Sequence, residues 1–65
     1  MISLGSSYIN AVSGRIIRVL HYVMVNSVKS VKMMETVDQY PGWKMIIYPE
    51  DKVEELIKNG YMVIL

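Results

Sequence analysis

The segment RIIRVLHYVMVNSVKSVKMMETV, residues 15–37, decides the fold of this 65-residue chain. It consists of two apolar runs that are dense in valine and isoleucine, residues that lose rotamer freedom in helices and favour strands. Asn26-Ser27 lies between the runs, and this pair suits a tight turn. We therefore predict an antiparallel hairpin, and pairing across a two-residue turn sets Arg18 opposite Glu35 and Leu20 opposite Met33.

An amphipathic helix over residues 15–35 is the alternative interpretation. On a helical wheel a polar stripe faces an apolar one. The polar stripe contains Arg15, Arg18, Tyr22, Asn26 and Lys29, and the apolar stripe contains Ile17, Leu20, Met24, Val28 and Val31. The density of β-branched residues favours the strands.

Further strands are predicted on both sides of this segment. Ser13-Gly14 separates YINAV from RIIRV by two residues, a hairpin signal. The aromatic and β-branched run Trp43 to Tyr48 follows the turn signal Pro41-Gly42. The run Tyr61 to Leu65 is too apolar for a free tail, so we expect it to pack in a sheet or against another subunit.

Residues 50–58 carry the local signals of a helix. Pro49 suits the first helical position, and Glu50 and Asp51 place negative charge in the first turn. Val53, Leu56 and Ile57 recur on one face, as in a half-buried helix. Asn59-Gly60 then ends the helix, because Gly60 can adopt the left-handed cap conformation.

Together these elements predict one α+β domain over residues 1–65, a small antiparallel sheet or SH3-like barrel with one C-terminal helix and a short terminal strand. The order of elements resembles small SH3-like β-barrel accessory proteins of bacteriophages and mobile elements. The resemblance rests on Gly5 followed by Tyr8, the hairpin at Ser13-Gly14 with its long strand, the strand at Trp43, and the terminal helix and strand. It implies a viral accessory or anti-defence protein and carries over no functional residue.

The predicted strand 15–25 has no polar face. Alternation places Ile17, Val19, Val23 and Val25 on one side and Ile16, Leu20, Tyr22 and Met24 on the other. Antiparallel sheets in small domains normally keep one face wet. We therefore expect one face to be core and part of the other to bind a second copy or a partner.

The composition is that of a small domain whose stability is expected to depend on association with another chain. Hydrophobic residues make up 52% of the chain, there is no cysteine, and the net charge is +1. A domain of this length buries only about 60% of its unfolded surface, so oligomerisation is expected. The lack of cysteine suits a reducing compartment, and we expect a cytoplasmic protein (host cytoplasm if viral) without signal peptide or membrane span.

Charge is unevenly distributed along the chain. Residues 1–34 contain four cations (Arg15, Arg18, Lys29 and Lys32) and no acid, whereas acids outnumber lysines from Glu35 onward. This asymmetry suits an anionic partner, and equally a charge complementarity within the chain or between copies.

The sequence contains no constellation typical of an enzyme. His21 is the only histidine, the residue type that ordinarily exchanges protons near neutral pH, and it lies in an apolar stretch where packing explains it. The helix acids are explained by a solvated face. We expect no catalytic activity, no cofactor and no metal.

Five residues are the candidates for binding: Arg15, Arg18, Tyr22, Tyr40 and Trp43. Arginine binds phosphate bidentately, and aromatic residues stack on bases or dominate protein interfaces. The predicted function is a non-catalytic module that self-associates and occupies or inhibits a partner protein. Two alternatives stay open: an oligomer that clamps a nucleotide or other small anion between subunits, and a nucleic-acid-binding barrel.

Overall fold

The segment 15–37 forms a β-hairpin, as the strand interpretation predicts. In the computed structural model, which describes all 65 residues, β2 (Ile16–Val25) and β3 (Val28–Thr36) pair in antiparallel fashion. Asn26 and Ser27 have φ values of 49° and 66°, and Val25 pairs with Val28. Positive φ at both central residues defines the type I′ turn, whose twist matches that of the two strands.

A β-bulge at Leu20 corrects the predicted register. His21 pairs with Lys32, as expected from the turn, but Val19 pairs with Met33, so Leu20 is an extra residue without a partner. The pairs predicted for Arg18 and Leu20 are therefore wrong, and Arg18 lies opposite Met34. A bulge shifts the alternation of side chains along its strand by one residue.

The bulge also corrects the predicted faces of β2. Before it, Ile17 and Val19 point into the core, and after it Tyr22 packs against the same core. Val23 lies on the opposite side, beside Ser30. Each of the two predicted side-chain sets is thus divided between both faces of the sheet.

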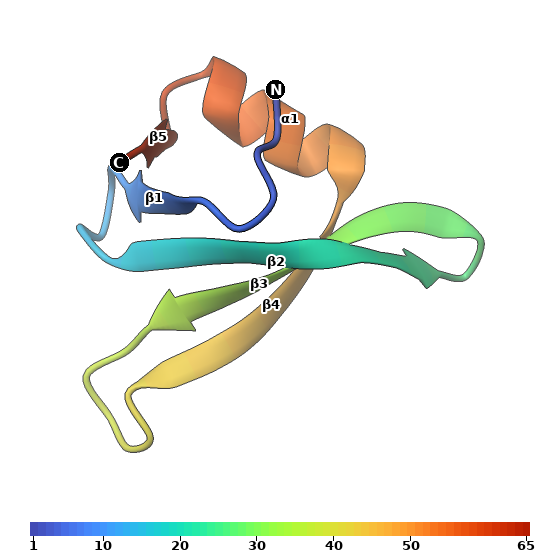
Figure 1. Cartoon of the computed structure of the whole chain (residues 1–65). Coiled ribbons are helices and arrows are strands. Elements are labelled where there is room, and N and C mark those ends of the chain that lie inside the picture. Colours follow the sequence, from blue (N-terminus) through green and yellow to red (C-terminus); the bar gives the residue numbers. More distant parts are fainter.

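The complete fold is a five-stranded antiparallel sheet in the order β4-β3-β2-β1-β5, with one helix. The other elements are β1 (Ser7–Asn10), β4 (Trp43–Pro49), α1 (Glu50–Lys58) and β5 (Met62–Ile64). Helix α1 follows one edge strand and precedes the other, and it lies over one face of the sheet (Figure 1). The predicted class, α+β with a C-terminal helix and a short terminal strand, is confirmed.

Helix α1 begins and ends close to the predicted residues. Pro49 is the last residue of β4 and the N-cap, one position before the predicted place. At the other end Tyr61 N–H donates to the Leu56 carbonyl (2.9 Å) and Gly60 N–H to that of Ile57 (3.2 Å). With φ of +79° at Gly60, this is a Schellman cap.

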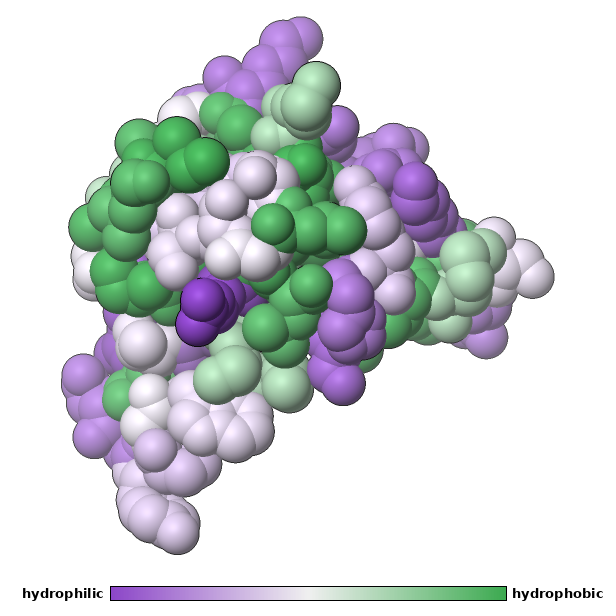
Figure 2. Space-filling view, in the orientation of Figure 1, coloured by the Kyte–Doolittle hydropathy of each residue, from purple (hydrophilic) through white to green (hydrophobic).

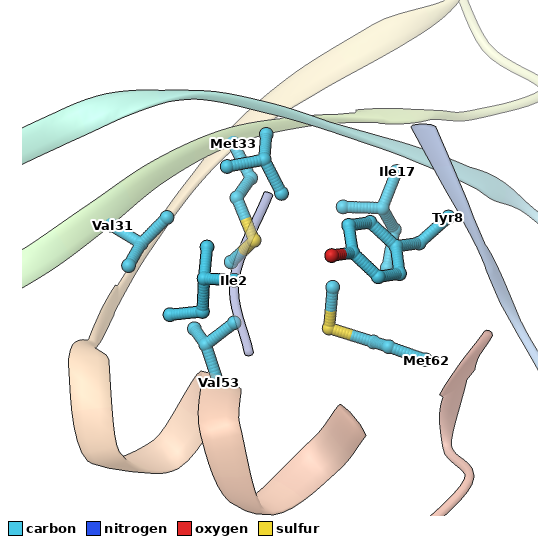
Figure 3. Close-up of a cluster of buried hydrophobic side chains, with 8 residues drawn as sticks. Ile2, Tyr8, Ile17, Val31, Met33, Val53 and Met62 are labelled. Atoms are coloured by element: carbon cyan, nitrogen blue, oxygen red, sulfur yellow. The ribbon is translucent and has the colours of Figure 1, made fainter. Parts of the chain in front are cut away.

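The core lies between α1 and the sheet (Figure 3). Its members come from the N-terminal segment, from four strands and from the helix, and their side chains point toward one another. The eight buried hydrophobic residues are Ile2, Tyr8, Ile17, Val19, Val31, Met33, Val53 and Met62. Val53 is the only buried residue of α1.

We expect Val53→Ala to lower the free energy of unfolding by about 2 kcal/mol, because it removes apolar volume at the only fully buried residue of the helix. Urea denaturation followed by circular dichroism measures this change. Glu55→Ala, at an exposed position of the same helix, is the control and should change stability little. Equal effects of the two substitutions would contradict the described packing of α1.

Candidate functional sites

The side of the sheet opposite α1, here called the helix-free face, is mostly apolar and carries no acidic side chain. The strand registers place on it Ser7, Ile9, Ile16, Arg18, His21, Val23, Val25, Val28, Ser30, Lys32, Met34, Thr36, Trp43, Met45, Ile47, Pro49 and Val63. The acids at 50, 51, 54 and 55 all lie on α1, on the other side of the sheet. The helix-free face therefore carries the cations Arg18 and Lys32 and no acid, whereas the core side carries acids and cations together, among them Lys29 and Lys44.

Strand β4 is an open edge of the sheet. It pairs with β3 on one side and with no strand on the other. Trp43, Met45 and Ile47 are 42–47% exposed along it. Lys44 is the only charged residue among its seven. A long, apolar edge strand of this kind is prone to pair with another chain, because its outward N–H and C=O groups lack partners.

Apolar side chains also remain exposed at the other edge. Val63, Ile64 and Leu65 are 47–69% exposed, although Met62 of the same run is buried. Figure 2 shows hydrophobic residues gathered over the part of the molecule formed by β1 and β5. The terminal run is thus only partly packed, as a strand beside β1.

A shallow groove on the helix-free face brings together two of the predicted binding residues, Arg18 and Trp43. Its volume is about 220 Å³, and Ser7, Ile16, Met34, Glu35 and Thr36 also line it. The carboxylate of Glu35 itself contacts Asn10 and Lys44 on the core side of the sheet. Arg18 lies on β2 and Trp43 on β4, so the groove crosses the strand between them.

A second hollow, here called the cleft, opens on the core side of the sheet between β4 and the β1–β5 edge. Its polar compartment is about 410 Å³ and its aromatic compartment about 300 Å³. The two share Asn10, Glu35 and Lys44. Arg15, Asp38 and Gln39 line the polar part, and Tyr48, Lys52, Leu56 and Tyr61 line the aromatic part.

Glu35 forms the floor of the cleft and is only 7% exposed. Its carboxylate has two distant partners, the Asn10 Nδ2 donor at 3.4 Å and Lys44 Nζ at 3.5 Å. The Asn10 side chain is fixed, because its Oδ1 accepts hydrogen bonds from the backbone N–H groups of Val12 and Ser13. A carboxylate accepts up to about four hydrogen bonds, so Glu35 keeps acceptor capacity inside the cleft.

The remaining predicted binding residues lie apart from the groove. Arg15 is in the cleft, where its guanidinium donates to the Thr36 carbonyl (3.2 Å) and to Asp38 Oδ2 (3.1 Å). Tyr40 is 99% exposed in the loop before β4. The structure therefore does not assemble Arg15, Arg18 and Tyr22 into one clamp within a single chain.

Tyr22 lies on the core side of the sheet near the start of α1. Lys29 Nζ is 4.2 Å from the centre of its ring, and Lys29 also pairs with Glu50 at 3.5 Å. Partial burial and the nearby Glu50 carboxylate raise the pKa of the Tyr22 hydroxyl. Through Lys29 and Glu50, Tyr22 takes part in a contact that joins the β2–β3 hairpin to the start of α1. This structural contact accounts for the position of Tyr22.

Glu35 is a cleft residue that is not among the five binding residues predicted from the sequence. Its signal was present, because alternation from the apolar Val31 and Met33 places Glu35 on the same inward side of β3. Lys44 and Tyr48 lie on the corresponding side of β4, opposite Glu35 and Val31. Their approach to Tyr61 depends on how the sheet curls under α1, which no local pattern encodes.

Comparison with known proteins returned no matching family model, no matching curated protein and no matching solved structure. The resemblance to SH3-like phage proteins therefore stays a prediction. No group of three or more histidine, cysteine, aspartate or glutamate side chains is placed to hold a metal ion. None of the structure's helices has the length and apolar character to cross a membrane.

We expect Glu35→Met to leave the free energy of unfolding unchanged or to raise it by up to about 1 kcal/mol. Burial of the carboxylate costs desolvation energy, and its two long contacts return little. Urea denaturation tests this, with Glu55→Met on the exposed helix face as the matched control. A loss of more than about 1 kcal/mol relative to that control would show that the carboxylate stabilises the fold.

Proposed function

We propose that this protein is a non-catalytic binding module that self-associates along β4 and uses its helix-free face to occupy a partner protein. The observation that carries the proposal is the open, apolar β4 edge beside an apolar sheet face. The lack of cysteine suits a reducing compartment, and we place the module in the cytoplasm.

A second copy of the chain is the occupant that β4 favours. Two identical edge strands can pair in antiparallel fashion around a twofold axis, which closes the assembly as a dimer. The other edge strand, β5, has only three residues and offers few backbone groups. An axis at Ile46 places Met45 beside Ile47 of the second copy, and Lys44 beside its Tyr48, so that apolar side chains meet on the helix-free face.

Charge favours pairing along the edge over stacking of two sheet faces. Face-to-face stacking would bring Arg18 and Lys32 of both copies to about 10 Å and bury them. Edge pairing separates the two β3 strands, which carry Lys32, by three strand intervals, about 14 Å, and the two β2 strands, which carry Arg18, by five, about 24 Å. Both distances exceed the Debye length of about 8 Å at physiological salt, so the repulsion is screened.

The dimer would present a doubled helix-free face with apolar residues, cations and no acid. Such a surface suits a partner protein with an acidic, partly apolar face, and the groove of Arg18 and Trp43 supplies the residue types that dominate protein interfaces. Single-stranded nucleic acid is less favoured, because each copy contributes only Arg18 and Lys32 as full cations on this face.

Ile47→Lys should convert the dimer into a monomer, because a lysine on an edge strand opposes strand pairing. Native mass spectrometry and sedimentation equilibrium measure the subunit number. Met24→Lys is the matched control, since Met24 is an exposed apolar residue of the β2–β3 hairpin, distant from the β4 edge. We expect this control to remain dimeric.

A wild-type protein that stays monomeric at about 100 µM would overturn the proposed self-association. A dimer that persists in Ile47→Lys and in a Met45→Lys, Ile47→Lys double variant would place the interface elsewhere, and would overturn the assignment to β4.

A further inference from the structure

We propose that the cleft binds a small ligand that joins a planar ring to a phosphate, of the mononucleotide class. This inference rests on the chemistry of the cleft within one chain and does not depend on self-association. Its two compartments, about 410 and 300 Å³, fall in the size range of pockets that hold small molecules.

The aromatic compartment suits a flat ring. Tyr48 and Tyr61 line it together with the apolar side chains of Leu56 and Met62, and Tyr61 is 50% exposed. Lys52 Nζ lies over the Tyr48 ring, 5.5 Å from its centre, so this compartment also contains a cation. Tyrosine stacks on any nucleobase, because every base presents a π-face.

The junction of the two compartments suits hydroxyl or amino donors. Glu35 points its buried carboxylate there, with acceptor capacity that Asn10 and Lys44 leave unused at 3.4 and 3.5 Å. A ribose diol or an exocyclic amine would supply the missing donors. Binding such donors would account for the burial of the Glu35 carboxylate, which its two long contacts within the protein do not explain.

The polar compartment suits an anion. Two cations line it, Arg15 and Lys44, against the two carboxylates Glu35 and Asp38, and Lys52 adds a third cation from the aromatic compartment. The Asp38 side chain is 93% exposed, so its ion pair with Arg15 is a weak surface pair. A phosphate can therefore replace Asp38 as a partner of the guanidinium, which keeps its hydrogen bond to the Thr36 carbonyl and has further N–H donors. Lys44 is 59% exposed and can approach the same anion.

Calorimetric titration with adenosine 5′-monophosphate tests the proposal on the intact chain. We expect saturable binding with one site per chain. Adenosine and inorganic phosphate, each of which fills only one compartment, should bind at least about tenfold more weakly. Absence of binding at about 1 mM nucleotide would overturn the proposal. Equal binding of phosphate alone would overturn its ring-recognition part.

Variants locate the site. Tyr61→Ala should weaken nucleotide binding about tenfold through loss of stacking. Tyr40→Ala removes an exposed tyrosine outside the cleft and should leave binding unchanged. Because Tyr61 also belongs to the helix cap, Lys44→Met at an exposed position provides an independent test, with Lys58→Met as its control. Nucleotide binding that is equal in Lys44→Met and Lys58→Met would overturn the assignment to the cleft.

Discussion

The rest of the structure depends on the extra residue at Leu20. On one side of this bulge β2 sends Ile17 and Val19 into the core, and on the other side it sends Tyr22 to the same face. Without the bulge, one half of the strand would present its inward residues to solvent. A bulge also increases local twist. Added twist helps the sheet to curl under α1, so that its two edges border one cleft.

A single helix leaves much of the apolar surface of the sheet uncovered. Helix α1 connects the two edge strands and covers one face of the sheet, and the other face has no element packed over it in this structure (Figure 1). Only eight hydrophobic residues are buried. A domain of this size has a thin stability margin, so association that covers the β4 edge would stabilise the fold as well as create a binding surface.

Features encoded by neighbouring residues could be predicted from the sequence, and features set by distant contacts could not. The Asn26-Ser27 turn, helix α1 and its glycine cap each depend on a few consecutive residues, and all three are present. No glycine or other local signal marks the bulge at Leu20. The groove shared by Arg18 and Trp43 depends on the register between three strands, which alternation within one strand does not reveal. The inward position of Glu35, by contrast, follows from its spacing to Val31.

Both proposed sites use the same strand, and alternation keeps them on different sides of it. Met45 and Ile47 face away from α1, toward the proposed subunit contact, while Lys44 and Tyr48 line the cleft. Pairing along β4 would restrict the backbone that carries Lys44 and Tyr48, so part of the entropy cost of ordering the cleft would be met before a ligand arrives. If dimerisation raises the affinity of the cleft for its ligand, then by linkage the bound ligand must raise the dimerisation constant by the same factor per site.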